Sequence, residues 1–340
     1  MSLLEIKGLT TEFKTDAGIV KAVRGVDYHV EKGEILGIVG ESGSGKSQGM
    51  LSLMGLLAGN GKVTSGSITF DGRDLSPNHY TTRAEKKQYA KMLQDIRGNE
   101  ISMIFQDPMT ALNPVKPVGE QIAEVVLLHN HCSKAEAMKR AQDMLAMVGI
   151  VPERYKEYPH QFSGGMKQRI VIAIALACEP DLLIADEPTT ALDVTIQAQI
   201  LDMMRKLQKD KGTSMILITH DLGVVAEMCD DVAVMYAGQI VEYGPLEEVF
   251  DHPKHPYTRA LYKSIPSLDK DVERLHVIPG LVPDPANLPA YCSFYERCQE
   301  KCDKCREFEP WAVEAAPGHV AKCIQYTPEW PADVKKGGEE

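Results

Sequence analysis

Apolar and polar residues follow two different spacings along this chain, and together these predict an α/β fold. Residues 1–30 alternate in short pieces such as LLEIKGLTTEF, which indicates antiparallel β-structure. The apolar runs at 34–39, 182–185 and 214–219 do not alternate, which is typical of parallel strands buried on both faces. Helical spacing precedes the two later runs, so we expect a mostly parallel βαβ sheet as the core.

Further elements follow from the same pattern. A β-segment is predicted at residues 66–70, before the turn signal Asp71-Gly72, and helices are predicted over residues 82–96 and 118–148. The charged residues between Arg83 and Lys91 are interpreted as the solvated face of the first of these helices.

The composition changes near residue 250, where prolines begin to recur and cysteines follow them. We therefore predict a main domain over residues 1–250, with a helical subdomain at about 107–165. Residues 251–340 are expected to form a small C-terminal extension, with a cysteine-rich motif at 292–323.

Composition and charge exclude several classes of protein. The chain has 340 residues, 44% of them hydrophobic, which is ordinary for a globular protein and excludes a fibrous or mostly disordered chain. Its net charge of −11 argues against wholesale nucleic-acid binding, which needs a basic surface. The longest apolar run, residues 170–178, is too short to span a bilayer, and the first residues do not resemble a signal peptide. Scattered cysteines indicate a reducing cytosol.

A glycine-rich segment between a predicted strand and a predicted helix matches the P-loop pattern G-x-x-x-x-G-K-S. Its glycines let backbone N–H groups wrap phosphate oxygens, and the helix N-terminus attracts the same anion. Lys46 is expected to reach the β- and γ-phosphates, and the Ser47 hydroxyl to hold Mg²⁺. The predicted phosphate-binding residues are Gly40, Ser42, Gly43, Ser44, Gly45, Lys46 and Ser47.

Two carboxylates end the apolar run at 182–185. In parallel sheets the carboxyl end of a buried strand lies beside the P-loop, so Asp186 is a candidate Mg²⁺ ligand. Glu187 points to the other side of the chain and is the candidate general base that polarises the attacking water.

The segment Phe162–Arg169 carries Ser163 as a helix N-cap, followed by two glycines that allow close approach to an anion. Its spacing does not say whose phosphate it binds. The pattern Ser-Gly-Gly-x-x-Gln-Arg resembles the signature motif of ATP-binding-cassette (ABC) ATPases. The resemblance assigns Ser163, Gly164, Gly165 and Gln168 to the signature, which acts in trans on the nucleotide of a second cassette.

Other elements of the ABC family follow in the right order. The resemblance implies that Gln106 is the Q-loop glutamine, which reaches Mg²⁺ and the water, and that Asp193 belongs to the D-loop. It implies that His220 is the switch histidine at the γ-phosphate and that Phe13 stacks on adenine. Catalysis is thus expected to involve Lys46, Gln106, Glu187 and His220, with two cassettes closing over two ATP molecules and hydrolysis reopening them.

The chain is most similar to the ATP-binding subunits of bacterial dipeptide and oligopeptide importers. The residues that carry this resemblance lie at 41–44, 105–114, 185–195, 255–261 and 278–280. It implies a peripheral protein on the cytoplasmic face of the membrane. The implied partners are a second ATPase subunit, usually in a heterodimer, two transmembrane permeases and an external peptide-binding protein.

Five cysteines cluster near the C-terminus. Cys292, Cys298, Cys305 and Cys323 resemble the pattern that holds a [4Fe–4S] cluster in this branch, and Cys302 is an alternative ligand. The pair Cys302-x₂-Cys305, with His319 as a nitrogen ligand, leaves zinc open as a second interpretation. Free or disulfide-bonded thiols are the third.

Two other functions compete with peptide import. The first keeps the transporter and replaces the peptide by nickel or another small cargo. The second is a non-transport ABC ATPase acting in DNA repair or translation, although such proteins usually carry two cassettes, long insertions or basic arms.

Overall fold

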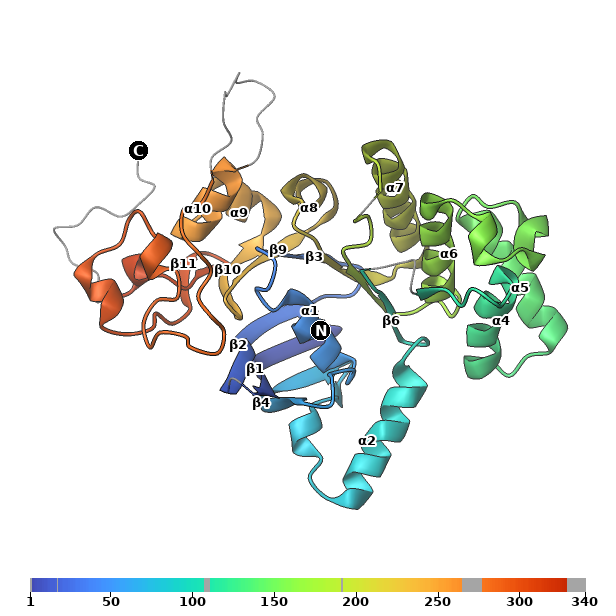
Figure 1. The fold of residues 1–340 in the computed structure, drawn as a ribbon, viewed down its shortest axis with the longest axis horizontal. Helices are drawn as coiled ribbons and strands as arrows, with labels where there is room; N and C mark the ends of the chain where they lie inside the picture. The colour runs from blue at the N-terminus through green and yellow to red at the C-terminus, as the bar shows by residue number, and fades with distance from the viewer. Residues whose placement is uncertain (1, 17, 107–110, 191, 265–276, 329–340) are drawn as a thin grey trace. The chain divides into compact units, whose positions relative to one another are not determined.

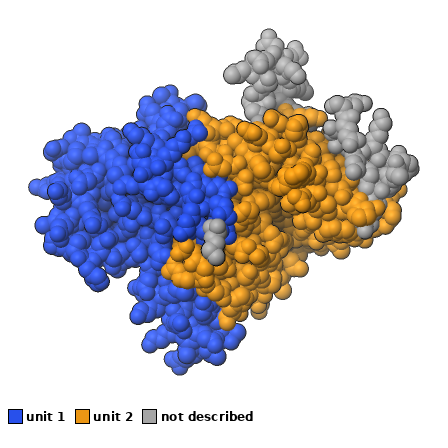
Figure 2. Space-filling model, turned by 180° about the vertical axis from the view of Figure 1, so that it is seen from behind, with its two compact units in different colours: residues 1–3, 30–35, 80–218 blue, residues 4–29, 36–79, 219–340 orange. Residues whose placement is uncertain are grey.

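The computed structural model describes residues 2–16, 18–106, 111–190, 192–264 and 277–328. These residues form two compact units, which Figure 2 shows in different colours. Unit 1 comprises residues 1–3, 30–35 and 80–218, and unit 2 comprises residues 4–29, 36–79 and 219–340. Each unit draws on separated stretches of the chain, and the predicted domain boundary near residue 250 stays a prediction.

Unit 2 contains a four-stranded sheet made by strands between residues 4 and 74 (Figure 1). Its order is β2-β1-β4-β5, and β1 runs antiparallel to β4, with Ile6 opposite Ile68. Both of these isoleucines are buried, as the alternating pattern requires. The predicted β-structure at residues 1–30 is therefore confirmed. The strands are β1 (Leu4–Thr15), β2 (Gly18–Val30), β4 (Gly61–Phe70) and β5 (Arg73–Asp74).

A second group of strands in unit 2 surrounds the strand that precedes the P-loop. Their order is β11-β12-β10-β9-β3, in which β3 runs parallel to β9 and the other neighbours are antiparallel. All of β3 is buried, which explains why its sequence is apolar without alternation. The bounds are β3 (Ile35–Val39), β9 (Asp231–Tyr236), β10 (Gln239–Pro245), β11 (Val313–Ala316) and β12 (His319–Ala321).

The helices of unit 2 are short. They are α1 (Lys46–Leu53), α8 (Leu222–Met228), α9 (Leu246–Asp251) and α10 (Pro256–Lys263). Single turns of 3₁₀-helix interrupt the remaining coil at Pro77–His79, Tyr295–Arg297, Asp303–Arg306 and Ile324–Tyr326.

Unit 1 contains three parallel strands, β6 (Ile101–Ile104), β7 (Leu182–Asp186) and β8 (Ser214–Ile218). Every residue of β7 and β8 is buried. The two apolar runs predicted to be parallel core strands are therefore confirmed, and the fold is the predicted mixed α/β architecture.

The helices of unit 1 follow the predicted pattern with one break. The helix predicted at 82–96 is α2 (Arg83–Ile96), which begins at a capping box of Thr82 and Glu85. The stretch 118–148 forms two helices, because Ser133 and Glu136 make a second capping box that starts α5. Figure 1 shows α4 and α5 packed beside α6. The bounds are α4 (Val118–His129), α5 (Lys134–Met147), α6 (Gly164–Leu176) and α7 (Val194–Lys211), with 3₁₀ turns at Pro152–Lys156 and Pro159–Gln161.

None of the helices in the part of the chain that the structure describes combines the length and the apolar character that crossing a bilayer demands.

Candidate functional site

The P-loop lies where the sequence predicts it, between the buried strand β3 and helix α1 of unit 2. Gly40 and Gly45 have φ angles of 149° and 99°, which side-chain-bearing residues rarely adopt. A Cβ on Gly40 would lie 2.1 Å from the carbonyl oxygen of Met235, and one on Gly45 would lie 2.1 Å from that of Ala22. The glycines are thus needed both for the turn and for its tight packing within unit 2.

Lys46 folds back onto the loop that precedes it. Its Nζ donates hydrogen bonds to the carbonyl oxygens of Gly40, at 2.8 Å, and of Glu41, at 3.0 Å. The residue is 7% exposed, so the ammonium group is held in a largely desolvated position. Charged phosphate oxygens are stronger acceptors than neutral carbonyls, so this geometry suits a lysine that transfers its bonds to a bound phosphate.

The serines of the P-loop differ in their surroundings. Ser44 is 2% exposed, and its Oγ has no hydrogen-bond partner among the residues that the structure describes. Its carbonyl oxygen accepts a hydrogen bond of 2.9 Å from the N–H of Gly238, which ties the loop to the β9–β10 turn. Ser42 is exposed, and Ser47, the predicted Mg²⁺ ligand, is partly exposed in the first turn of α1.

Phe13 lies on β1, opposite Gly61 of β4. The aromatic ring covers that glycine so closely that a Cβ on Gly61 would be 2.4 Å from the Cε1 atom of Phe13. One side of the ring is therefore fixed by packing, and the side chain as a whole is partly exposed. Stacking of this ring on adenine stays a prediction.

The two carboxylates predicted from the sequence lie at the end of β7 in unit 1. Asp186 is 5% exposed and ends the strand. Glu187 has a φ of 47°, an uncommon conformation for a residue with a side chain, and its N–H donates to the carbonyl oxygen of Ile218 at 2.8 Å. Strained backbone of this kind is characteristic of functional sites.

The carboxylate of Glu187 is held by two donors. Its Oε2 accepts hydrogen bonds from Nε2 of Gln106, at 3.0 Å, and from Oγ1 of Thr190, at 2.9 Å. The structure thus brings together the predicted general base and the predicted Q-loop glutamine, which are 81 residues apart. Thr190 was missed by the sequence reasoning, although its position three residues after Glu187 could have suggested the contact.

The predicted signature motif forms the start of α6. Ser163 caps the helix by accepting a bond from the N–H of Met166, and Ser163 and Gly164 are exposed. A Cβ on Gly165 would lie 2.6 Å from Cγ2 of Ile196, so only glycine fits there. Gln168 is 1% exposed and lies inside unit 1. Action of these residues on a second cassette stays a prediction.

The last two predicted residues follow other elements. Asp193 caps α7, since its Oδ1 accepts a 3.0 Å hydrogen bond from the N–H of Ile196. His220 follows Thr219 in unit 2 and is exposed. Their contacts with nucleotide stay predictions, and the Q-loop residues 107–110 and the D-loop residue Ala191 lie outside the described part of the chain.

The cysteine-rich segment does not form the predicted metal site. Cys292, Cys298, Cys305 and Cys323 line one small pocket of unit 2, but all eight cysteines of the chain are free. Among the described residues, no three His, Cys, Asp or Glu side chains are arranged to hold a metal ion. The iron–sulfur prediction is therefore wrong.

The cysteines are packed as apolar side chains, since Cys305 lies in a buried cluster with Tyr295 and Ile324, and Cys292 and Cys302 pack against that cluster. Burial raises the pKa of Cys292, Cys298 and Cys305 to about 11. The zinc alternative fails on the same geometric ground, because no such group of three side chains is found among the described residues. His319 is fully buried and its Nε2 lies 2.7 Å from Oε1 of Glu242.

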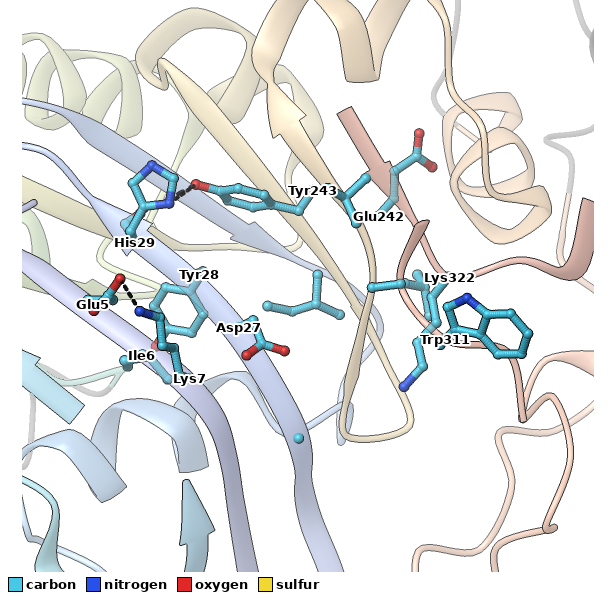
Figure 3. A pocket seen from close by; sticks show the side chains of 15 residues that line it. Glu5, Ile6, Lys7, Asp27, Tyr28, His29, Glu242, Tyr243, Trp311 and Lys322 are labelled. Atoms are coloured by element: carbon cyan, nitrogen blue, oxygen red, sulfur yellow. Dashed lines mark hydrogen bonds and ion pairs between the residues drawn. The ribbon is translucent and has the colours of Figure 1, made fainter. Parts of the chain in front are cut away.

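A pocket of about 380 Å³ lies in unit 2, lined by residues of β1, β2, β10 and the C-terminal segment. Figure 3 shows Tyr243 directed toward His29 at its rim, with Trp311 and Lys322 on the opposite side. None of the residues predicted to bind nucleotide lines this pocket.

The chain is similar to known proteins over nearly its whole length. The family described as "ABC transporter" matches residues 23–190, and the "Oligopeptide/dipeptide transporter, C-terminal region" matches residues 241–305. The chain is 50% identical to the oligopeptide transport ATP-binding protein AppD of Bacillus subtilis, over 96% of this chain and 98% of the relative. It is 52% identical to the dipeptide transport ATP-binding protein DppD of Lactococcus lactis, over 97% of this chain and 92% of the relative.

A solved structure is also similar. It is a dimeric ATP-binding cassette in a post-hydrolysis state, bound to ADP and phosphate. The TM-score is 0.61 at 27% sequence identity, and the match covers 72% of this chain and 98% of the solved chain.

Proposed function

Because the chain belongs to the ATP-binding subunits of ABC peptide transporters, a family of transport-coupled ATPases, we propose that it hydrolyses ATP to drive uptake of di- or oligopeptides. The family resemblance inferred from the motifs is confirmed by these comparisons. Relatives named for oligopeptide and dipeptide transport favour a peptide over nickel as the cargo. They equally favour transport over a role in DNA repair or translation.

One observation carries the proposal at the level of chemistry. Glu187 stands at the end of a buried strand in a strained backbone conformation, and its carboxylate is oriented by Gln106 and Thr190. A carboxylate held in this way can accept a proton from water without first reorganising. The structure therefore supports the role of general base for this residue.

Phosphate binding is assigned to the P-loop. Lys46 already bonds two carbonyl oxygens of the loop, and bound ATP would offer charged oxygens in their place. Backbone N–H groups from Gly40 to Ser47 would surround the phosphates. We assign His220 to the γ-phosphate and Phe13 to the adenine ring.

Mg²⁺ is expected with ATP in this family. Its ligands would be the hydroxyl of Ser47, the carboxylate of Asp186 and the amide oxygen of Gln106, all oxygen donors of the kind that Mg²⁺ prefers. These residues would hold the ion, whose positive charge would stabilise the negative charge that develops on the phosphate oxygens.

A second cassette is proposed to complete each ATP site. Ser163 and Gly164 are exposed at the N-terminus of α6, so they are available to an anion that another subunit presents. Gly165 packs on Ile196 and Gln168 is buried, so these two residues would support the motif from within. The similar solved cassette is a dimer bound to ADP and phosphate, which supports this arrangement. The Asp193 region would lie at the same interface.

Permease subunits are the proposed membrane partners, and they would hold the chain at the cytoplasmic face of the membrane. An external peptide-binding protein would deliver peptide to these permeases. The helical part of unit 1 presents exposed apolar side chains that a permease could cover. Val115 is 78% exposed, Leu128 is 69% exposed and Val151 is 58% exposed. Exposed apolar side chains of this size are typical of protein–protein contacts when they gather in one region.

The test is an uptake assay in cells that lack the chromosomal copy of this gene, complemented with variants of the full chain. Labelled dipeptide, labelled oligopeptide and nickel are offered separately. Wild-type chain should restore peptide uptake, and Glu187→Gln should express and bind ATP without restoring it. Restoration of nickel uptake alone, or of neither cargo, would refute the peptide assignment.

A further inference from the structure

One residue of the P-loop is held by the C-terminal part of the chain. The carboxylate of Glu41 forms a two-pronged ion pair with Arg297, which is 256 positions away in the sequence. Nη1 of Arg297 lies 2.6 Å from Oε2 of Glu41, and Nη2 lies 2.9 Å from Oε1. Paired hydrogen bonds of this geometry fix both position and orientation, unlike a single point contact.

The guanidinium group of Arg297 is fully used. Besides Glu41, it donates to the carbonyl oxygens of Pro279 and Ile278 and to the hydroxyl of Tyr236. Each of its five N–H donors thus has an acceptor, and the side chain is only 5% exposed. A lysine, which lacks the planar fork, cannot reproduce this set of bonds.

The backbone of Glu41 is held as well. Its N–H donates a 3.0 Å hydrogen bond to the hydroxyl of Tyr257, a fully buried residue of α10. Side chain and backbone of the same P-loop residue are therefore fixed by two different parts of the region beyond residue 250. Neither contact is required by the P-loop pattern, which leaves this position open.

Glu41 connects these contacts to the phosphate-binding lysine. Its carbonyl oxygen accepts from Nζ of Lys46 at 3.0 Å and from the N–H of Ser44 at 3.2 Å. A loop that is already held in one conformation loses less conformational entropy when ATP binds. Freeing Glu41 should consequently weaken ATP binding more than it slows the chemical step.

We propose that Arg297 and Tyr257 clamp Glu41 and thereby position the P-loop for ATP, so that the C-terminal region is part of the ATP site. This inference rests on the proposed ATPase function and deepens it. Arg297 and Tyr257 are positioning residues, because they act through Glu41 and Lys46.

The experiment compares Arg297→Lys, Tyr257→Phe and Glu41→Gln in the full chain, assembled with its partner subunits. We expect the KM for ATP to rise about tenfold in Arg297→Lys, which partly loses the charged contact with the Glu41 carboxylate. In Tyr257→Phe, which loses the neutral hydrogen bond to the Glu41 backbone, the KM should rise about threefold. kcat should stay within about twofold, because the groups that hold Glu187 are untouched. Affinity for a fluorescent ATP derivative, measured on the full chain alone, should fall in parallel.

A matched control lies in the same region. Nε and Nη2 of Arg259 donate to the two carboxylate oxygens of Glu300, and Nη1 donates to the carbonyl oxygens of Pro253 and Lys254. All of these partners lie outside the P-loop. Arg259→Lys should lower the melting temperature as much as Arg297→Lys while leaving the KM for ATP unchanged. Equal KM changes in both variants would mean that general loosening, rather than the clamp, is responsible.

Coupling between the two charged residues gives a second readout. If Arg297 acts through Glu41, the double variant Arg297→Lys/Glu41→Gln should raise the KM for ATP by much less than the product of the two single fold-changes. Should Arg297→Lys fail to fold, Tyr257→Phe and Glu41→Gln still carry the test. The proposal is refuted if all three variants fold and keep the wild-type KM. A wild-type chain that binds no ATP would instead refute the proposed function.

Discussion

Replacing Thr190 by valine tests how Glu187 is positioned. The Oγ1 of Thr190 donates a 2.9 Å hydrogen bond to Oε2 of Glu187, the same oxygen that accepts from Gln106. Valine has nearly the shape of threonine and removes the donor. The variant should therefore keep its fold and remove one hydrogen bond from the carboxylate.

The expected effect follows from the strength of such a bond. A hydrogen bond to a charged group contributes about 1.5–3 kcal/mol. Because Gln106 still holds the carboxylate, the lower end of this range applies. A rise of about 1.5 kcal/mol in the activation free energy corresponds to about a tenfold fall in kcat. The KM for ATP should change little, since the hydrogen bond that is lost is made to Glu187 and not to the phosphate-binding lysine.

Steady-state ATP hydrolysis by the assembled transporter measures this effect. Thr190→Ser keeps the hydroxyl and is the matched control, with kcat expected near that of the wild-type protein. The reasoning fails if Thr190→Val and Thr190→Ser have the same kcat. A rise in KM without a fall in kcat would equally contradict it.

Three further predictions follow from packing, titration and surface exposure. Gly61→Ala should lower the free energy of unfolding by about 1–3 kcal/mol because its Cβ would overlap the ring of Phe13, whereas Gly59→Ala, with no atom within 4 Å, should not. Burial and then the charge of Arg259 lower the pKa of His255 from 6.5 to about 3, so the unfolded chain binds more protons between these pH values. The contribution of His255 to the free energy of unfolding is therefore fully present above pH 6.5 and is lost as the pH falls, by about 2 kcal/mol at pH 5. His255→Asn should abolish this part of the pH-dependent loss. Leu128→Asp, on an exposed site of α4, should weaken assembly with the permeases without changing ATP affinity.

Each of these predictions has a direct measurement. Urea unfolding distinguishes Gly61→Ala from Gly59→Ala, and equal midpoints would contradict the packing argument. Unfolding at pH 7 and pH 5 tests His255, and a variant that loses as much stability as the wild-type chain would rule out this histidine as the cause. Co-purification with the permeases tests Leu128→Asp, for which an unchanged yield of complex is the adverse result.

The local elements of the site could be predicted because short-range physical chemistry determines them. A P-loop needs glycines where φ is positive and where a Cβ would strike a neighbour, and Gly40 and Gly45 meet both conditions. Asp186 and Glu187 were predicted because an apolar run without alternation marks a buried strand whose end carries functional residues. The helix break at Ser133 was missed, although its capping box with Glu136 was present in the sequence.

The cysteine cluster shows where spacing fails as evidence. Cysteine intervals give the number of candidate ligands, but the chain between Cys292 and Cys323 is mostly irregular, so no period fixes where each sulfur points. The tertiary arrangement decides against a metal site, because no three candidate side chains among the described residues come together to hold an ion.

The sequence by itself determined the phosphate-binding loop, the carboxylate pair and the family, because each depends on residues that are neighbours in the chain. Only the tertiary structure decided which distant groups hold them. Gln106 reaches Glu187 across 81 positions, and Arg297 reaches Glu41 across 256. Contacts over such distances depend on how strands and coil are packed, and no local pattern of residue types records that packing.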